Sequence, residues 1–200
     1  MPTNLSAAER TIAEKSTHVY RTRIQDQNGA AILLANVAAL TLTCYRAGAV
    51  TEIINSRTAQ NVLNANNVTY ASGSGTITAA SNAAPIVVTS ATHGRATGDW
   101  LYVSTVLGNA AANGLWKITK VDANSFELDG SVGDGTYASG GTWDYSLLEW
   151  ELQTLDNAIV GTGAVGTLEE HVALFRMTYA TTKILNWEFR TFIENLGVVT

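Results

Sequence analysis

The sequence predicts an all-β protein in which a small β domain is inserted into a larger one. Strand-like runs rich in β-branched and aromatic residues recur along the chain, separated by turn pairs such as Asn113-Gly114 and Asp129-Gly130. The composition fits strands, with 26 Thr, 17 Gly and only 2 Pro. Two Gly/Ser-rich segments, 71–75 and 138–141, separate a central group of short strands from the segments on either side.

The N-terminal part of the chain predicts one helix and then strands. Ser6-Ala7-Ala8-Glu9 has the spacing of a capping box, so we expect a short helix or a docking arm over residues 1–16. Strand patterns follow at Val19–Gln25, Ala39–Tyr45 and Val50–Ile54. Asn28-Gly29, after the first of these, favours a hairpin turn. The polar residues 56–67 predict a loop or one helical turn.

The central segment predicts a small sandwich or barrel. Its short strands are expected at Ile86–Thr89, Trp100–Val106, Leu115–Val121 and Ser125–Leu128. Large apolar residues at strand positions are suited to filling this barrel: Trp100, Trp116, Phe126 and Trp143. We therefore divide the chain into an arm (1–16), a host domain (17–72 plus 144–200) and an insert (73–143).

The C-terminal part returns to the style of the first segment. Strands are expected at Leu147–Leu152, Val172–Tyr179 and Ile184–Ile193. Residues 170–179 also fit helical spacing. We favour a strand because the neighbouring segments are Thr-rich and β-branched.

Charge and hydropathy exclude several classes of protein. The net charge is -5, and nucleic-acid binding through a basic face is not expected, because phosphate contacts need clustered Lys and Arg. Cys44 is the only cysteine, so no disulfide forms within the chain. The most apolar stretch, residues 30–42, is shorter than the ~20 residues of a membrane span, and no signal peptide is apparent, so membrane insertion is not expected.

Several motifs resemble catalytic or cofactor sites, and each has a simpler interpretation. Gly161-Thr162-Gly163-Ala164-Val165-Gly166 matches the dinucleotide fingerprint G-x-G-x-x-G, and Glu188 lies about 20 positions further on. No alternation of strands and helices surrounds it, so we interpret it as a loop without a cofactor. Asp129–Gly135 reads as two successive turns rather than a calcium loop.

The titratable residues likewise predict no metal site and no catalytic residue. His18, His93 and His171 do not stand at ligand spacing from one another or from Cys44, which reads as a core residue. An acidic pair for glycoside hydrolysis would have to come from carboxylates that the sequence does not place together. These carboxylates are Glu149, Glu151, Glu169 and Glu170.

The insert carries a resemblance to a known module. Its ordered motifs are His93–Asp99, Asn109–Trp116, Val121–Gly130 and Gly140–Trp143. Together they resemble the small β-barrel related to the first catalytic-cysteine half-domain (FCCH) of ubiquitin-activating enzymes, in the form found in phage tail and fibre proteins. The insert has no cysteine, so no ubiquitin chemistry is implied. Residues 39–45, 53–57, 60–64, 156–160 and 169–175 resemble immunoglobulin-like domains of phage tail or baseplate proteins.

These resemblances imply an immunoglobulin-like β-sandwich interrupted by a small β-barrel, and a non-enzymatic structural role. The expected place is the virion of a tailed phage (tail, baseplate or neck), assembled in the bacterial cytoplasm. Partners would be copies of itself and other virion proteins, with the barrel projecting outward. Only 14% of residues are charged, against ~25% in a typical soluble domain, so more than ~800 Å² per subunit should be buried against partners.

Three alternatives remain open. In the first, the chain is expected to be a capsid decoration protein, and in the second a small hydrolase. In the third, it is expected to be a receptor- or carbohydrate-binding module of a tail fibre. In the binding module, Tyr102, Tyr137 and Tyr145 would form the interaction surface for a host receptor or glycan.

Overall fold

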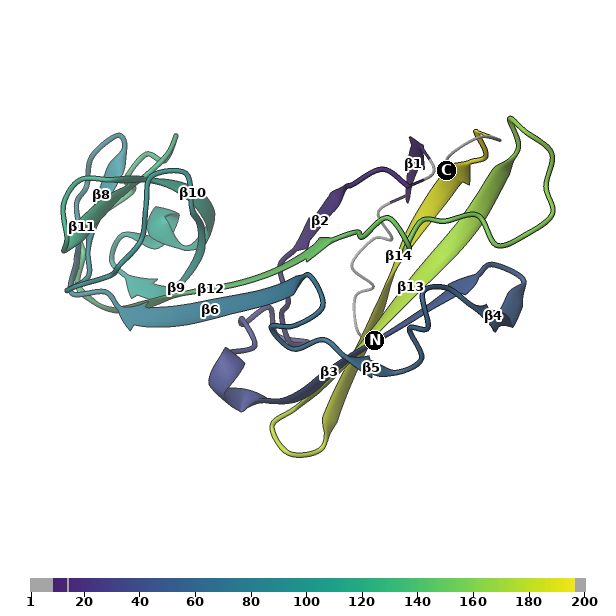
Figure 1. Ribbon diagram of the computed structural model, residues 1–200. Helices are drawn as coiled ribbons and strands as arrows, with labels where there is room; N and C mark the ends of the chain where they lie inside the picture. The colour runs from purple at the N-terminus through teal and green to yellow at the C-terminus, as the bar shows by residue number, and fades with distance from the viewer. Residues whose placement is uncertain (1–8, 14, 197–200) are drawn as a thin grey trace. The chain divides into compact units, whose positions relative to one another are not determined.

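The computed structural model describes residues 9–13 and 15–196, and these form strands almost throughout (Figure 1). The all-β prediction is confirmed. The chain divides into two compact units. Unit 1 comprises the described residues of Met1–Gln27, Leu34–Ala71 and Leu147–Thr200, and unit 2 comprises Asn28–Leu33 and Ser72–Ser146.

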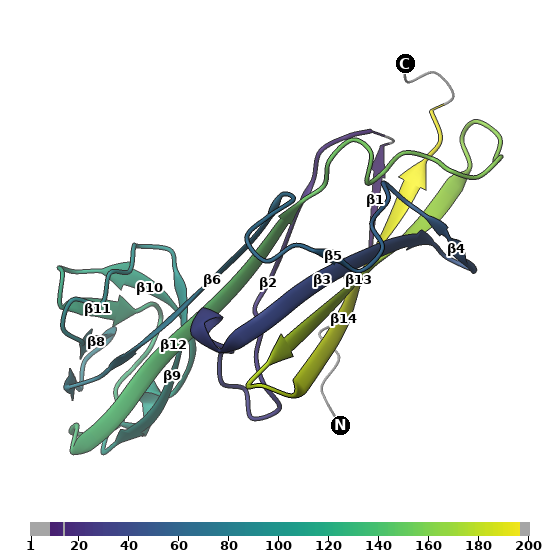
Figure 2. The same cartoon turned by 60° about the horizontal axis from the view of Figure 1, so that its bottom comes forward.

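The larger sheet of unit 1 has six strands. Their order is β1 (Glu9–Ala13), β14 (Lys183–Glu194), β13 (Leu168–Tyr179), β3 (Val37–Arg46) and β4 (Ala49–Ile53), with β5 (Gln60–Asn61) also paired to β3 (Figure 2). Strand β13 lies antiparallel to both β14 and β3, whereas β1 runs parallel to β14. The strand interpretation of residues 170–179 is therefore confirmed over the helical one.

A second layer of unit 1 comes from β2 (Val19–Thr22), the end of β12 (Ser139–Glu151) and the start of β6 (Val68–Thr76). Antiparallel pairing joins β2 to Leu148–Glu151 of β12, and β6 also pairs with β12. Aromatic rings join the two layers: the centroids of Tyr20 and Phe189 lie 4.8 Å apart, and those of Trp150 and Phe175 lie 5.5 Å apart. These spacings are typical of packed aromatic pairs, so the two layers form a β-sandwich.

Alternation along β3 has the predicted effect. Leu40, Leu42 and Cys44 are buried in the sandwich, because successive side chains of a strand point to opposite faces.

Unit 2 is a small, strongly curved sheet, and Figure 1 shows its strands curling around a common centre. Its order is the start of β12, then β9 (Trp100–Leu107), β10 (Gly114–Lys120), β11 (Ser125–Leu128), β8 (Ile86–Thr89) and β7 (Ala79–Ala80). A short 3-10 turn, η2 (Ala110–Ala112), contacts β9, and a second, η1 (Leu34–Asn36), precedes β3 in unit 1. Phe126 and Trp143 are buried in the unit 2 core, as predicted.

The helix expected near the N-terminus is wrong for the part that the structure describes. Residues 1–8 lie outside the described residues, and Glu9–Ala13 forms β1, paired with Arg190–Glu194. A capping box is a weak local preference, and the open edge of β14 offers a row of backbone hydrogen bonds that a strand can satisfy.

The structure has a turn at Gln27-Asn28, as expected, between the isolated bridge residues Gln25 and Ala31. Gly29 does adopt a positive φ of 84°, as a turn requires. However, β2 pairs with β12 rather than with the strand that follows it in sequence. Asn28–Leu33 groups with unit 2, where the Ala31 N–H donates to Asp144.

The two Gly/Ser segments predicted as breaks lie within strands. Ala71–Gly75 belongs to β6, and Ser139–Gly141 begins β12. A Cβ at Gly73 would lie 2.7 Å from Cε1 of Tyr145, and one at Gly75 would lie 2.6 Å from the indole of Trp143. Glycine stands at these strand positions because aromatic rings cover its backbone.

Candidate functional site

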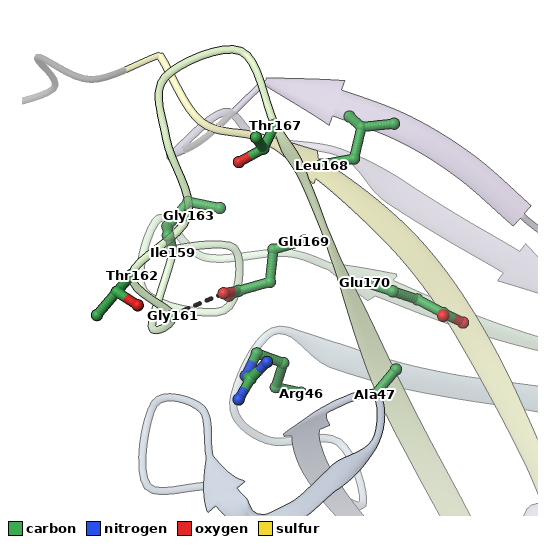
Figure 3. A pocket seen from close by; sticks show the side chains of 10 residues that line it. All are labelled: Arg46, Ala47, Ile159, Gly161, Thr162, Gly163, Thr167, Leu168, Glu169 and Glu170. Carbon is green, nitrogen blue, oxygen red and sulfur yellow. Dashed lines mark hydrogen bonds between the residues drawn. The ribbon is translucent and has the colours of Figure 1, made fainter.

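One pocket in unit 1 is lined by part of the G-x-G-x-x-G loop. It has a volume of about 440 Å³ and lies between the β3–β4 turn and the loop that leads into β13 (Figure 3). Its lining residues are Arg46, Ala47, Ile159, Gly161, Thr162, Gly163, Thr167, Leu168, Glu169 and Glu170.

The loop amides bind a carboxylate of the chain itself. Glu169 accepts hydrogen bonds from the N–H groups of Val160 at 2.9 Å and Gly161 at 2.7 Å. Figure 3 shows Glu169 turned toward Gly161 and Glu170 turned away from it, as expected for neighbours on a strand. A phosphate would need these same N–H groups, which Glu169 already occupies.

Hydrogen bonds outweigh burial in setting the pKa of Glu169. Burial raises the pKa of this carboxyl, but the bonds from the Val160 N–H, from His171 and from the Gly161 N–H together hold the pKa below its usual value. The carboxylate is therefore ionised at neutral pH and serves as a fixed anchor for the loop. Glu188, which the fingerprint would need as a ribose ligand, lies on β14 and pairs with Arg190 at 2.8 Å instead.

The other charges of the pocket are also paired. Arg46 binds both carboxylate oxygens of Glu52, at 2.5 and 2.7 Å, and this ion pair holds the pKa of Glu52 below its usual value. Glu170 pairs with Arg190 at 2.6 Å. Each charged group that lines this pocket is thus committed to a partner within the chain.

A buried ion pair lies beside the pocket. Arg57 and Asp156 are almost completely buried, and Nη2 of Arg57 donates to Oδ2 of Asp156 at 2.9 Å. Arg57 also donates to Gln60 and Gln153, and Asp156 accepts from Asn55. The pair therefore fixes the loop after β12 against the segment between β4 and β5.

Sequence reasoning missed this pair, although a signal was present. Asp156 is the only charged residue in 152–168, and Arg57 is the only charged residue in 53–94. An isolated charge within a long uncharged stretch is a candidate for burial with a partner of opposite sign.

His171 joins the two networks. Its Nε2 lies 2.7 Å from Oε1 of Glu169, and its Nδ1 lies 3.3 Å from the backbone oxygen of Asp156. One of these oxygens comes from β13 and the other from the loop after β12, so His171 acts as a structural link between them.

Cys44 lies beneath this region and is buried. Burial raises the pKa of its thiol far above the usual value, the charge of Asp156 adds to that effect, and Arg57 opposes it. The thiol stays protonated and is a poor nucleophile, in keeping with its interpretation as a core residue.

A second pocket in unit 1, of about 290 Å³, contains Glu149 and Glu151. These two carboxylates lie on one face of β12, whereas Glu169 and Glu170 line the larger pocket. Glu149 forms an ion pair with Arg21 on β2. The four carboxylates that the sequence left unplaced are therefore divided between two pockets.

The other histidines have local roles. Nε2 of His93 lies 2.9 Å from the backbone oxygen of Asp122, and its Nδ1 accepts from the Arg95 N–H at 3.1 Å, so it holds a turn. His18 packs edge-on against Tyr20. Within the described residues, no three His, Cys, Asp or Glu side chains come together as metal ligands. No helix in the described ranges is long and apolar enough to cross a membrane.

The three tyrosines proposed as an interaction surface are half-buried. Tyr137 donates to the backbone oxygen of Gly140 at 2.8 Å and packs against the unit 2 core. Tyr145 also packs on this core, with the guanidinium of Arg95 4.0 Å above its ring. Tyr102 lies on β9, opposite Leu115 of β10.

Trp100 does not fill the barrel as the sequence suggested. Its side chain is 57% exposed and lies on β9 opposite Lys117 of β10, on the same face as Tyr102. The alternation of β9 decides its position, because Leu101 and Val103 take the inward sites. Trp116 is half-buried, with its indole N–H donating to the Ala112 oxygen at 2.8 Å.

Comparisons with known proteins add little. No family model matches the chain, and no curated protein matches it. Among solved structures, the chain is similar to the collagen-binding subdomain of the Enterococcus faecalis surface protein ACE, at 9% identity over 94% of both chains, with a TM-score of 0.18.

Proposed function

We propose that the chain is a non-enzymatic structural subunit of a multi-subunit assembly, of the tailed-phage type whose tail, baseplate or neck modules the sequence resembles. One observation carries the proposal: a weakly charged surface that exposes many large apolar side chains. They are Val50, Trp100, Leu107, Leu115, Val121, Val132, Leu147, Leu155, Val160, Val165, Leu168, Ile184 and Leu196. Such residues are normal singly, but with only 14% charged residues they favour burial against partners.

An edge strand offers a second kind of contact. Strand β4 ends the strand order of the six-stranded sheet, and its Val50 is 67% exposed. A strand edge presents backbone N–H and C=O groups to which a neighbouring subunit can pair. The pairing of the pocket charges within the chain likewise favours a structural role for that region over catalysis.

Within this proposal, unit 1 is an immunoglobulin-like sandwich. Its strand orders β14-β13-β3 and β2-β12-β6 correspond to the G-F-C and B-E-D orders of that fold. Unit 2 is then an insertion between strands D (β6) and E (β12), where an added domain leaves the sandwich pairing intact.

The decisive experiment is the composition of intact particles. Tailed particles would be purified from the cells that encode the chain and analysed by mass spectrometry and cryo-electron microscopy. The proposal expects peptides of this chain in fixed stoichiometry and density that fits unit 1 at symmetry-related positions. Particles that lack the chain would overturn it.

One feature favours a second candidate, a receptor- or carbohydrate-binding module. Trp100 and Tyr102 stand two residues apart on β9 with Lys117 and Leu115 opposite, which combines aromatic planes with a hydrogen-bond donor. Aromatic planes of this kind stack on the apolar face of a pyranose ring. A glycan array with the full chain tests it: binding should be lost in Trp100→Ala and kept in Leu107→Ala, an exposed residue of the same strand.

A further inference from the structure

The outward face of β9 and β10 brings four side chains onto one surface of unit 2. The register of the two strands pairs Trp100 with Lys117. At the next outward position it pairs Tyr102 with Leu115. Paired residues point to the same face, and this face looks away from the core, because Leu101 between the two rings is buried in that core. Trp100 is 57% exposed and Leu115 50%, and Lys117 is exposed as well. These four residues are called the aromatic face below.

Polar groups border the aromatic face on both sides. On β12, Asp144 pairs with Tyr102. On the opposite side, the Asp129 N–H donates to the backbone oxygen of Lys117 at 3.0 Å, which places Asp129 next to Lys117. Glu127 of β11 lies on the same outward side, because the residues before and after it in the strand are buried. Hydrogen-bond donors and acceptors therefore lie around an exposed apolar ring.

This combination favours a sugar over a protein as the ligand. The centre of a protein–protein interface is depleted of Lys, Glu and Asp, whereas Lys117 stands directly opposite Trp100. A pyranose has an apolar face of C–H groups, which packs on an aromatic ring, and a rim of hydroxyls, which need donors and acceptors beside that ring. The aromatic face and its border offer both.

We propose that the aromatic face binds neutral pyranose sugars. Trp100 packs on the C–H face of the sugar ring, and Lys117 donates a hydrogen bond to a sugar hydroxyl. The inference rests on the receptor- or carbohydrate-binding function given above as the second candidate, and it names the class of ligand.

Charge selects neutral over acidic sugars. The carboxylates of Asp129, Glu127 and Asp144 border the face, against the single ammonium of Lys117 within it. A carboxylate, sulfate or phosphate on the sugar would meet more negative than positive charge. A neutral sugar avoids this repulsion and still uses Lys117 as a donor.

The size of the contact sets its strength. One packed ring and a few hydrogen bonds bury little surface, so binding by a single copy is weak. An assembly that carries several copies would hold a polysaccharide through many such contacts at once, with a large gain in overall affinity.

Nuclear magnetic resonance of the full chain tests the inference. The probes are the methyl glycosides of glucose, galactose and mannose, with the methyl glycoside of glucuronic acid as the acidic counterpart. The indole N–H signal of Trp100 is identified as the one missing from Trp100→Ala. It should shift progressively with at least one neutral glycoside and much less with the glucuronide.

Two comparisons assign the shift to the aromatic face. The indole N–H of Trp116 donates to the Ala112 oxygen at 2.8 Å, and its signal should stay in place. Lys117→Met keeps the apolar stem and should weaken binding about tenfold, the loss expected for one hydrogen bond to a charged group. Leu107→Ala, at an exposed position of the same strand, should bind as wild type.

The remaining outcomes count against the inference. A Trp100 signal that no neutral glycoside moves, or that moves only together with the Trp116 signal, would overturn the site. A larger shift with the glucuronide would overturn the choice of neutral sugars, and unchanged binding in Lys117→Met would overturn the role of that residue.

Particle composition separates this inference from the proposed assembly function. If intact particles contain the chain but the Trp100 signal does not move, the sugar site is wrong and the assembly function survives. If the signal moves but the particles lack the chain, the assembly function is wrong and the sugar site stands.

Discussion

Arg57 and Asp156 stand 99 residues apart in sequence and form a buried ion pair. Their side chains fix the long loop after β12 to the segment that follows β4. Removing one partner of a buried ion pair destabilises the fold strongly, because the other charge then stays in the interior without compensation.

Asp156→Ala should lower the free energy of unfolding by about 3–5 kcal/mol, because the guanidinium of Arg57 would remain buried without its carboxylate. Urea unfolding monitored by tryptophan fluorescence measures this change. The control is Glu52→Gln, which removes the partner of Arg46 at an exposed site and should cost much less. Equal losses in the two variants would contradict the assigned role of the buried pair.

Glu169 should make the protein sensitive to acid. Its pKa in the folded chain lies below the ordinary value of 4.5, so its stabilising effect is complete above that pH. The effect is lost as the pH falls from 4.5 through the lower folded value. Unfolding followed from pH 6 to pH 3 should show a shallower decline in Glu169→Gln than in wild type, at roughly these pH values.

High salt separates this effect from that of an exposed carboxylate. The pKa of Glu52 is also lowered, mainly by its bond to Arg46, but Glu52 is exposed and its contribution should be screened. The Glu169 contribution should persist in salt, because backbone N–H groups supply much of it.

Gly108 should not tolerate a side chain. Its φ is +88°, and a Cβ would lie 2.1 Å from the Thr136 oxygen. Gly130 has a similar φ of +76° but open space around it. Gly130→Ala should cost about 1–2 kcal/mol from backbone strain alone, and Gly108→Ala distinctly more. Thermal unfolding of both variants measures the difference, and similar melting temperatures would contradict the steric explanation.

The tryptophans of unit 2 should differ sharply in their effect on stability. Trp143 is buried, and its indole N–H donates to Oγ of Ser90 at 2.7 Å, so Trp143→Ala should cost about 3–5 kcal/mol. Trp100→Ala should change stability by less than about 0.5 kcal/mol, because the ring faces solvent. Denaturant titration of both variants checks this. A large loss of unfolding free energy in Trp100→Ala would mean that Trp100 packs in the core.

Unit 1 should fold without most of unit 2. Replacing residues 76–142 by a short Gly/Ser linker keeps β2, the end of β12 and the six-stranded sheet. We expect a β-type circular dichroism spectrum and cooperative unfolding, since the Tyr20, Trp150 and Phe189 cluster lies wholly in unit 1. An unfolded deletion variant would rule out the insertion arrangement.

The strands that sequence reasoning found are those whose side chains alternate or are β-branched. Ile86–Thr89 and Ser125–Leu128 have the predicted bounds, β9 is one residue longer at its end, and β3 and β10 differ by one or two residues at each end. These strands can be recognised from their own sequence, because the side chains on one face must be apolar.

What sequence reasoning missed depends on partners distant in sequence. Strand β1 exists because β14 offers it an edge, and β6 continues through Gly73 and Gly75 because the rings of β12 lie over them. The Arg57–Asp156 pair likewise joins two segments that no local pattern connects. The sequence predicted a loop at Gly161–Gly166 but gave no sign that the carboxylate of Glu169 binds the loop amides.

Because Gly73 lies so close to Tyr145, the substitutions that each position can accept depend on the residue at the other. A methyl group at position 73 becomes acceptable only after the ring at 145 has been replaced by a smaller side chain, and losing the ring first exposes the core that it covers. Each single step is therefore harmful, whereas the double change restores the packing. Across descendants of this sequence, glycine at 73 and an aromatic residue at 145 should be kept together or lost together, and the same holds for Gly75 and Trp143.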